Sequence, residues 1–318
     1  MASGTPLPKN VLVFGATGVI GKYIIQELYN ARSSFGKIGF FTSKSTAETK
    51  AGDVNGWKAK GVEVIVGDVN SEDDVNKAYK GYDVVISALG RNAIAAQIPL
   101  IKLAESAPSI KYFYPSEYGT DIEYGPASAT EKPHQFKLQV RKYIRENTKK
   151  LKFTYLVTGP YSDMFFSPAG KDERIGSFNI TEKKATLLGT GNEKISFTTM
   201  RDVGRLLVAA LETPTTSHER TLKVNSFTTT GKEALAEFEK QTGAKWEVSY
   251  TPLDALKKVE KEAWEKDSPH KTSATLRRIW LEGGTLYNVR SNGEIGFEGK
   301  EETLEGHVRE IIAKHDGV

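Results

Sequence analysis

The chain has 318 residues, 38% of them hydrophobic, which is enough for a large domain with a smaller companion. The formal net charge is +4, but lysines and arginines alternate with acids and no basic block stands out, so the composition does not indicate nucleic-acid binding. The absence of cysteine excludes disulfides, thiolate metal sites and cysteine nucleophiles.

Two further absences limit the class of protein. The N-terminus from Met1 to Lys9 has no apolar leader, and no apolar run approaches the ~18 residues that span a bilayer. We therefore expect a cytoplasmic protein without membrane association. The five histidines lack the spacing of metal ligands, such as a pair at i and i+4, so we predict no metal site.

The first half of the chain alternates apolar runs of strand length with helical stretches. The runs lack period-2 alternation, as expected for strands that are buried on both faces. This order predicts an α/β fold, a doubly wound parallel sheet of the Rossmann type that binds ligands beyond the carboxyl ends of its strands. The predicted strands are Val11–Phe14, Ile38–Thr42, Val62–Val66, Asp83–Leu89, Lys111–Pro115 and Phe153–Thr158.

After Thr158 the alternation weakens into loops and short strands with glycine turns. A helix over 201–212 and a strand over 221–225 then suggest a return to the sheet. We therefore predict a dinucleotide-binding domain over 1–158, to which 195–226 returns, and a smaller substrate-binding region within 159–318.

The stretch "VLVFGATGVIGKYI" sets Gly15, Gly18 and Gly21 between the first strand and the first helix. A tight turn, a close backbone approach and helix-strand packing each require a missing side chain. A pyrophosphate can then bind at the helix N-terminus. Glycine turns also join strands to helices for structural reasons alone, but the position at the first strand favours nucleotide binding.

The end of the second strand indicates which nucleotide. NAD sites usually have an acid about 20 residues beyond the glycines, whereas "FFTSKST" offers Ser43 and Lys44 and no acid before Glu48. A lysine beside hydroxyl groups suits the 2′-phosphate of NADPH, and a solvated loop lysine is the alternative. Asp68 follows the third strand, where it could contact adenine or cap the next helix.

A tyrosine followed four residues later by lysine is one source of a proton in dehydrogenases of this fold. None of the 13 tyrosines has that spacing. The helical stretch "PHQFKLQVRKYIRE" offers Lys137 at the edge of its apolar stripe, where partial desolvation would lower its pKa. On periodicity alone, a surface lysine with a buried aliphatic stem is the competing interpretation.

Four motifs together resemble a known family. They are "GATGVIG", "SALG" after the fourth strand, "YPSEYGTD" from Tyr114 to Asp121, and "KLQVRKYI" from Lys137. The chain is similar to the NmrA-like, isoflavone reductase-like reductases, which are atypical short-chain dehydrogenases related to pinoresinol-lariciresinol reductases. The resemblance implies NADPH as cofactor, hydride transfer to an aromatic substrate, and Lys137 as the catalytic acid and base.

The resemblance also assigns the remaining site residues. Ala88, Leu89 and Gly90 would line the nicotinamide ribose side, with Gln97 near it on the following helix, although Ala88 and Leu89 could be strand core. The pyrophosphate would be held by Gly15, Thr17, Gly18, Val19 and Gly21, and the 2′-phosphate by Ser43 and Lys44. The substrate side would be lined by Ser116, Glu117 and Tyr118, which follow the fifth strand, with Glu117 alternatively capping a turn. Separately from the resemblance, Tyr161, Met164 and Phe165 could form an apolar wall for a flat substrate, and a packed core under a loop is the alternative.

Differences from the plant reductases, in "TSKST" and "TGPYSDMF", favour a fungal-type member with another substrate. We expect a reductase that transfers hydride to an aromatic or conjugated carbonyl compound. The alternative is a non-catalytic NmrA-like regulator that senses a dinucleotide and binds a protein partner. His134 has two possible roles, helix-end solvation and proton relay. The sequence leaves the oligomeric state open.

Overall fold

A seven-stranded parallel sheet forms the larger part of the computed structural model, which describes residues 7–168 and 172–317. The strand order β10-β6-β5-β4-β1-β2-β3 reverses direction at β1 and β4, as in doubly wound folds. The strands are β1 (Asn10–Phe14), β2 (Lys37–Thr42), β3 (Glu63–Val66), β4 (Val84–Ser87), β5 (Tyr112–Tyr114), β6 (Lys152–Val157) and β10 (Glu219–Lys223).

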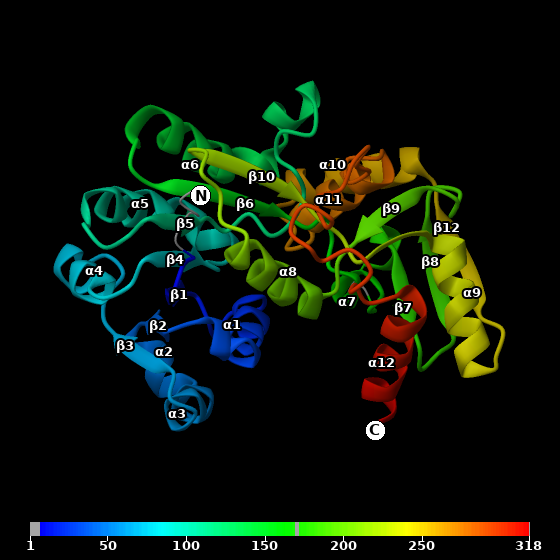
Figure 1. Cartoon of the computed structure of the whole chain (residues 1–318). Helices are drawn as coiled ribbons and strands as arrows, with labels where there is room; N and C mark the ends of the chain where they lie inside the picture. Colours follow the sequence, from blue (N-terminus) through cyan, green and yellow to red (C-terminus); the bar gives the residue numbers. More distant parts are fainter. Residues whose placement is uncertain (1–6, 169–171, 318) are drawn as a thin grey trace.

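Helices cover both faces of this sheet (Figure 1). On one face α1 (Gly21–Asn30) packs against α8 (Met200–Glu212), and Gly204 permits the close approach because a Cβ there would lie 2.7 Å from the carbonyl oxygen of Tyr23. The other face carries α4 (Glu72–Tyr79), α5 (Gln97–Ser106) and α6 (Gln135–Asn147). At the β3 edge lie α2 (Lys44–Thr49) and α3 (Ala51–Ala59).

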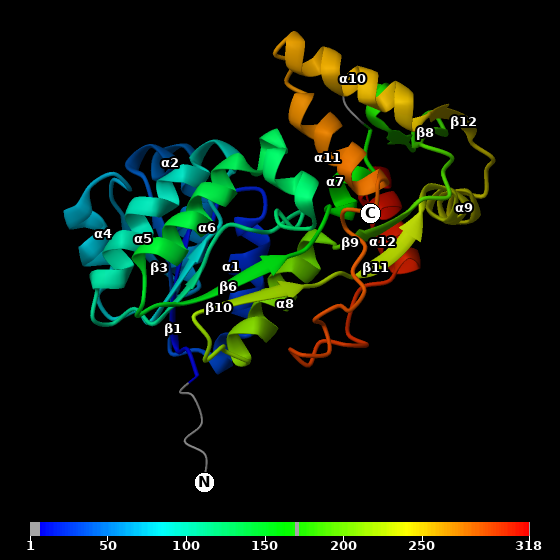
Figure 2. The same ribbon diagram turned by 90° about the horizontal axis from the view of Figure 1, so that it is seen from above.

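The smaller region lies beside the carboxyl ends of β6 and β10 (Figure 2). Its core contains an aromatic cluster that includes Phe166, Phe178 and Phe238. Its strands are β7 (Ser177–Asn179), β8 (Lys184–Leu188) and β12 (Glu247–Thr251) in one sheet, and β9 (Lys194–Phe197) and β11 (Phe227–Thr230) in another. Its helices are α7 (Ser162–Phe165), α9 (Gly231–Thr242), α10 (Leu253–Glu265), α11 (Lys271–Leu281) and α12 (Leu304–Asp316).

The six strands predicted for the first half are all present, with ends shifted by one or two residues. The return to the sheet consists of α8 and β10, so it begins at Met200 rather than at 195, because β9 pairs with β11 instead. A second return was missed by the sequence analysis. Ile295 and Phe297 pack into the core on the α8 face, although they lie in the predicted substrate-binding region. Within the described residues, no helix is long and apolar enough to cross a membrane.

Candidate active site

The turn between β1 and α1 approaches the chain that leaves β4. Gly15 has a φ of +83°, and a Cβ on it would lie 2.6 Å from the carbonyl oxygen of Ala88. A Cβ on Gly21 would collide with the backbone of Gly15, so both positions require glycine. The N-terminus of α1 has no side-chain cap and no acid in its first turn. Nothing acidic therefore competes with an anion at this turn.

Two lysines and a serine lie near the end of β2. Ser43 is the N-cap of α2, and its hydroxyl accepts the Thr46 N–H at 3.1 Å. Lys44 is exposed in the first turn of that helix. Lys50 was not predicted from the sequence, yet its Nζ donates to the carbonyl oxygen of Thr17 in the glycine turn at 2.6 Å. Lys44 and Lys50 thus both follow β2, and Lys50 contacts the glycine turn.

A cavity of about 600 Å³ lies between the glycine turn, the ends of β4 and β5, and α11 of the smaller region. Val19, Phe136 and Met164 are 61%, 51% and 57% exposed, although each is a large apolar side chain. Apolar surface of this kind, gathered on one cavity, is typical of a ligand site. The predicted site residues on its wall are Gly18, Val19, Ala88, Leu89, Gly90, Ser116, Tyr118, Lys137, Tyr161, Met164 and Phe165.

Gln97 lies behind the cavity wall, and its position near the nicotinamide ribose stays a prediction. Its side chain is buried, and it donates to the carbonyl oxygen of Ile94 at 3.1 Å. Its Oε1 accepts the Ser116 N–H at 2.7 Å. Because both ends of the amide are engaged within the protein, Gln97 holds the strand end that carries Ser116 from behind.

Asp68 lies outside the cavity as well. Its carboxylate accepts the Asn70 N–H at 2.9 Å in the exposed turn after β3. The N-cap of α4 is Ser71, whose hydroxyl accepts from Asp74, so the alternative role of Asp68 as a helix cap is wrong. An adenine contact stays a prediction.

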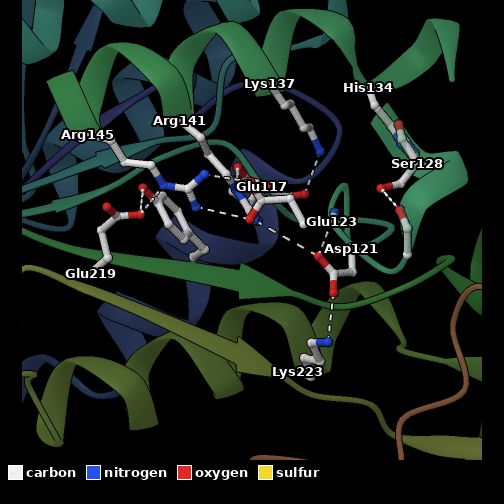
Figure 3. A network of polar contacts seen from close by, with 12 residues as sticks. Glu117, Asp121, Glu123, Ser128, His134, Lys137, Arg141, Arg145, Glu219 and Lys223 are labelled. Carbon is white, nitrogen blue, oxygen red and sulfur yellow. Dashed lines mark hydrogen bonds and ion pairs between the residues drawn. The ribbon is translucent and has the colours of Figure 1, made fainter. Parts of the chain in front are cut away.

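Lys137 lies in the first turn of α6, and its stem is half-buried. Its Nζ donates to the backbone carbonyl oxygen of Glu117 at 2.5 Å (Figure 3). The pKa of this ammonium is lowered to about 8, mainly by burial. The Glu117 carboxylate opposes this effect, and the nearby charges of Arg91 and Arg141 contribute to the lowering. This lysine is thus a far stronger acid than an ordinary one and lies on the cavity wall.

A network of paired charges lies behind Lys137 (Figure 3). Arg141 Nε contacts Glu117 Oε1 at 2.9 Å, and both side chains are at most 2% exposed. Arg141 also binds Glu123 at 2.7 Å, and Arg145 binds the same carboxylate at 2.6 Å. Hydrogen bonds from Arg145 hold the pKa of Glu123 at about 2. Asp121 pairs with Lys223 at 2.8 Å, which ties the network to β10.

The network corrects the assignment of the Glu117 side chain to the substrate wall. Its carboxylate points away from the cavity toward Arg141, and only its backbone carbonyl faces Lys137. The alternative of a turn cap is also wrong, since the carboxylate oxygen Oε1 binds a guanidinium. The spacing "KLQVR" explains this arrangement, because residues four apart on a helix share a face. Lys137 and Arg141 therefore meet the same residue from one side.

His134 immediately precedes α6 and lines the cavity. Its ring is only 1% exposed, which excludes the helix-end solvation considered from the sequence. Nδ1 lies 3.1 Å from the Ser128 carbonyl oxygen, and Nε2 is buried without a described hydrogen-bond partner. Burial lowers the pKa of His134, so the ring is neutral at neutral pH. A proton relay through Nε2 stays a prediction.

The remaining wall is largely aromatic. Tyr161 donates its hydroxyl to the carbonyl oxygen of Tyr118 at 2.7 Å. The Tyr118 hydroxyl is buried without a hydrogen-bond partner among the described residues, and burial raises the pKa of that phenol well above its usual range. Phe165 joins the wall to the aromatic core of the smaller region. Several wall residues were missed because they follow no recognisable motif, namely Arg91, Phe136, His270, Ser273, Arg277 and Trp280.

The described residues contain no group of three His, Asp or Glu side chains with the placement of a metal site.

Comparison with known proteins relates the chain to a group of reductases. A family model described as the NmrA-like family matches residues 8–278. The isoflavone reductase homolog P3 of Arabidopsis thaliana is 29% identical over 297 residues, which cover 92% of each chain. A crystal structure of isoflavone reductase superposes with a TM-score of 0.77 at 25% identity, covering 95% of this chain and 99% of that one. A leucoanthocyanidin reductase–NADPH complex from Vitis vinifera gives a TM-score of 0.78 at 20% identity, covering 96% and 99%.

Proposed function

We propose that this chain, which belongs to the NmrA-like family, is an NADPH-dependent reductase of a small aromatic molecule. The observation that carries the proposal is the position of Lys137. Its Nζ, with a pKa lowered to about 8, lies on the wall of a cavity that also reaches the glycine turn. A proton donor and a dinucleotide cradle thus share one enclosed space, as reduction of a bound molecule requires.

The proposed cofactor fits the residues that are present. The glycine cradle and the acid-free N-terminus of α1 suit a pyrophosphate, held by Gly15, Thr17, Gly18, Val19 and Gly21. Lys44 and Lys50 suit a 2′-phosphate, with Ser43 beside them. The complex of the related leucoanthocyanidin reductase contains the same cofactor. When bound, NADPH supplies a hydride.

Lys137 is the proposed acid. Its Nζ is mostly in the ammonium form at neutral pH but releases a proton readily, because burial has lowered its pKa. An electron-poor carbon that accepts a hydride leaves negative charge on the conjugated oxygen, and the ammonium stabilises and protonates that oxygen. The Glu117 carbonyl oxygen accepts one N–H and so fixes the direction of the others.

The wall favours a flat, aromatic substrate. Phe136, Tyr161, Met164 and Phe165 offer broad apolar surface, and the exposed fraction of Met164 leaves it free to adapt to a ring. Relatives named for isoflavone and leucoanthocyanidin act on molecules of this class. We therefore propose an aromatic or conjugated carbonyl compound as the substrate of this chain.

The test is NADPH oxidation with a panel of aromatic enones and quinone methides. We expect Lys137→Ala to lower turnover at least about 100-fold while NADPH affinity stays within about threefold. Lys142→Ala is the matched control, since Lys142 lies on the same helix but is exposed. Full turnover of Lys137→Ala would remove the lysine from the mechanism. A protein that binds NADPH yet oxidises none of it with any compound would favour the dinucleotide-sensing regulator instead.

A further inference from the structure

The cavity is lined by cations and by no acid of the described residues. Its positive side chains are Arg91, Lys137 and Arg277, with His134 and His270 as further nitrogen donors. Lys137 is held by the Glu117 carbonyl and is the proposed proton donor. Arg91 directly follows Gly90, on the side assigned to the cofactor. Arg277 belongs instead to α11 of the smaller region, away from both the proposed proton donor and the side assigned to the cofactor.

Arg277 is a buried charge without a counter-ion. It is 7% exposed, and it forms no ion pair with any described acid. Its Nη1 donates to the Gly176 carbonyl oxygen at 3.2 Å, and its guanidinium lies 4.4 Å from the centre of the Phe165 ring. Burial lowers the pKa of Arg277 to about 10, so it remains charged at neutral pH. A guanidinium in such surroundings is costly unless an anion joins it.

The protein makes room for this arginine. Gly176 has a φ of +92°, and a Cβ there would lie 2.8 Å from Arg277 Nη1. A side chain at position 176 would therefore displace the guanidinium from its position between Gly176 and the Phe165 ring. Gly176 and Phe165 thus hold Nη1 and one face of the guanidinium, and Arg277 is a residue of the cavity wall.

The same helix face supplies two more polar groups. His270, Ser273 and Arg277 are spaced i, i+3 and i+7, so they lie on one side of α11, and all three line the cavity. The Nε2 atom of His270 is buried without a described partner. An imidazole nitrogen, a hydroxyl and a guanidinium on one face can together surround the oxygens of an anion.

We propose that this face of α11 binds a carboxylate group of the substrate, so that the substrate is an aromatic carboxylate. This inference rests on the proposed function, because it concerns the molecule that Lys137 would protonate. The planar fork of Arg277 matches a carboxylate, and the apolar wall accepts the rings between that group and the reacting carbon. The positive cavity thereby excludes neutral analogues by leaving the guanidinium without a partner.

The experiment compares 4-carboxychalcone with its methyl ester, two flat enones that differ in one charge. Their binding to the NADP+-loaded protein is measured by calorimetry, which needs no turnover. We expect the wild-type protein to bind the carboxylate at least about tenfold more tightly than the ester. Arg277→Gln should remove that preference while changing the affinity for the ester by less than about threefold. Arg309→Gln, which removes an exposed arginine of α12, should keep the preference.

Equal affinity for the two probes in the wild-type protein, including binding of neither, overturns the proposal. So does a preference that survives in Arg277→Gln. If this variant does not fold, Arg277→Lys replaces it, and its loss of preference is expected to be partial because lysine keeps the charge without the fork.

Turnover separates the two proposals. If the protein binds the carboxylate through Arg277 but oxidises no NADPH with either probe or with any compound of the panel, the reductase proposal fails and the carboxylate site stands. If it reduces both probes with equal KM, the carboxylate site fails and the reductase proposal stands.

Discussion

Buried charge occurs in two different settings on opposite sides of Lys137. Behind the lysine, Arg141 is paired with Glu117 and Glu123, and its charge is met inside the protein. On the cavity wall, Arg277 is also buried but pairs with no acid of the described residues. The comparison distinguishes Arg141, whose ion pairs are internal to the protein, from Arg277, for which we propose an anionic ligand.

The paired network has a specific geometric role. Glu117 is the one residue that binds both Arg141, through its carboxylate, and Lys137, through its carbonyl. Fixing the Glu117 side chain therefore fixes the peptide that holds the Lys137 ammonium. The stacking of the Arg141 guanidinium 4.4 Å from the Tyr155 ring adds a further restraint from β6.

The largest expected effect comes from breaking the paired side. Arg141→Met leaves the Glu117 carboxylate buried without a counter-charge, so the free energy of unfolding should fall by about 3–5 kcal/mol. Urea unfolding measures the loss. Adding Glu117→Gln should recover part of it, because no buried charge then remains unpaired. Lys142→Met, which breaks an exposed pair with Glu146, should cost less than about 0.5 kcal/mol. A loss as small as that in Arg141→Met would contradict the network.

Lys137 lies between the paired network and the cavity. Its lowered pKa is expected to make both turnover and stability depend on pH. With Lys137 as the proposed proton donor, turnover should fall about tenfold per pH unit above a midpoint near 8, because the ammonium then loses its proton. The folded pKa lies below the unfolded one, so the unfolded chain holds more protons between pH 8 and about 10.4. Stability should therefore rise with pH in that window, by roughly 1–2 kcal/mol after screening.

The matched variant for this pH effect is Lys137→Met. Subtracting its pH–stability curve from that of the wild-type protein removes the tyrosines that titrate in the same range. The difference curve should rise from about pH 8, where the folded Lys137 loses its proton. A flat difference curve would show that the pKa of Lys137 is the same in the folded and unfolded chains.

A smaller effect is expected at Lys50, which we propose binds the 2′-phosphate of NADPH. Lys50→Ala should weaken NADPH binding about tenfold and NADH binding less than about twofold, because only NADPH carries the 2′-phosphate. Lys58→Ala on the neighbouring α3 is the control. Calorimetry of each nucleotide measures both ratios. Equal weakening for the two nucleotides would move the role of Lys50 to the pyrophosphate turn, whose Thr17 carbonyl it contacts.

The smallest effect is expected at Arg277. Arg277→Met leaves no acid unpaired, so the stability of the unliganded protein should change by less than about 1 kcal/mol. Urea unfolding of Arg277→Met and Arg141→Met under the same conditions measures the difference between their losses in the free energy of unfolding. A loss at Arg277 as large as that at Arg141 would assign the guanidinium to the architecture and not to a ligand.

The sequence predicted the backbone of the sheet domain well and the side-chain directions less well. Strands buried on both faces appear as apolar runs, and the glycine turn is visible because its geometry excludes side chains. Glu117 was assigned to the cavity because it follows β5, but a residue at a strand end can point to either side of the turn. Arg141 attracts its carboxylate to the far side. The sequence also gave no sign that the amide of Gln97 binds Ser116 and Ile94 inside the protein.

The sequence by itself determined the order of strands and helices, the glycine turn, the choice of a cation at the end of β2, and the Lys137 block. These are local properties, because periodicity, missing side chains and i, i+4 spacing act over a few residues. Only the tertiary structure decided which buried charges have partners. Arg277 meets the cavity of Lys137 from a helix 140 positions away along the chain, and no local pattern records whether an acid lies across that space.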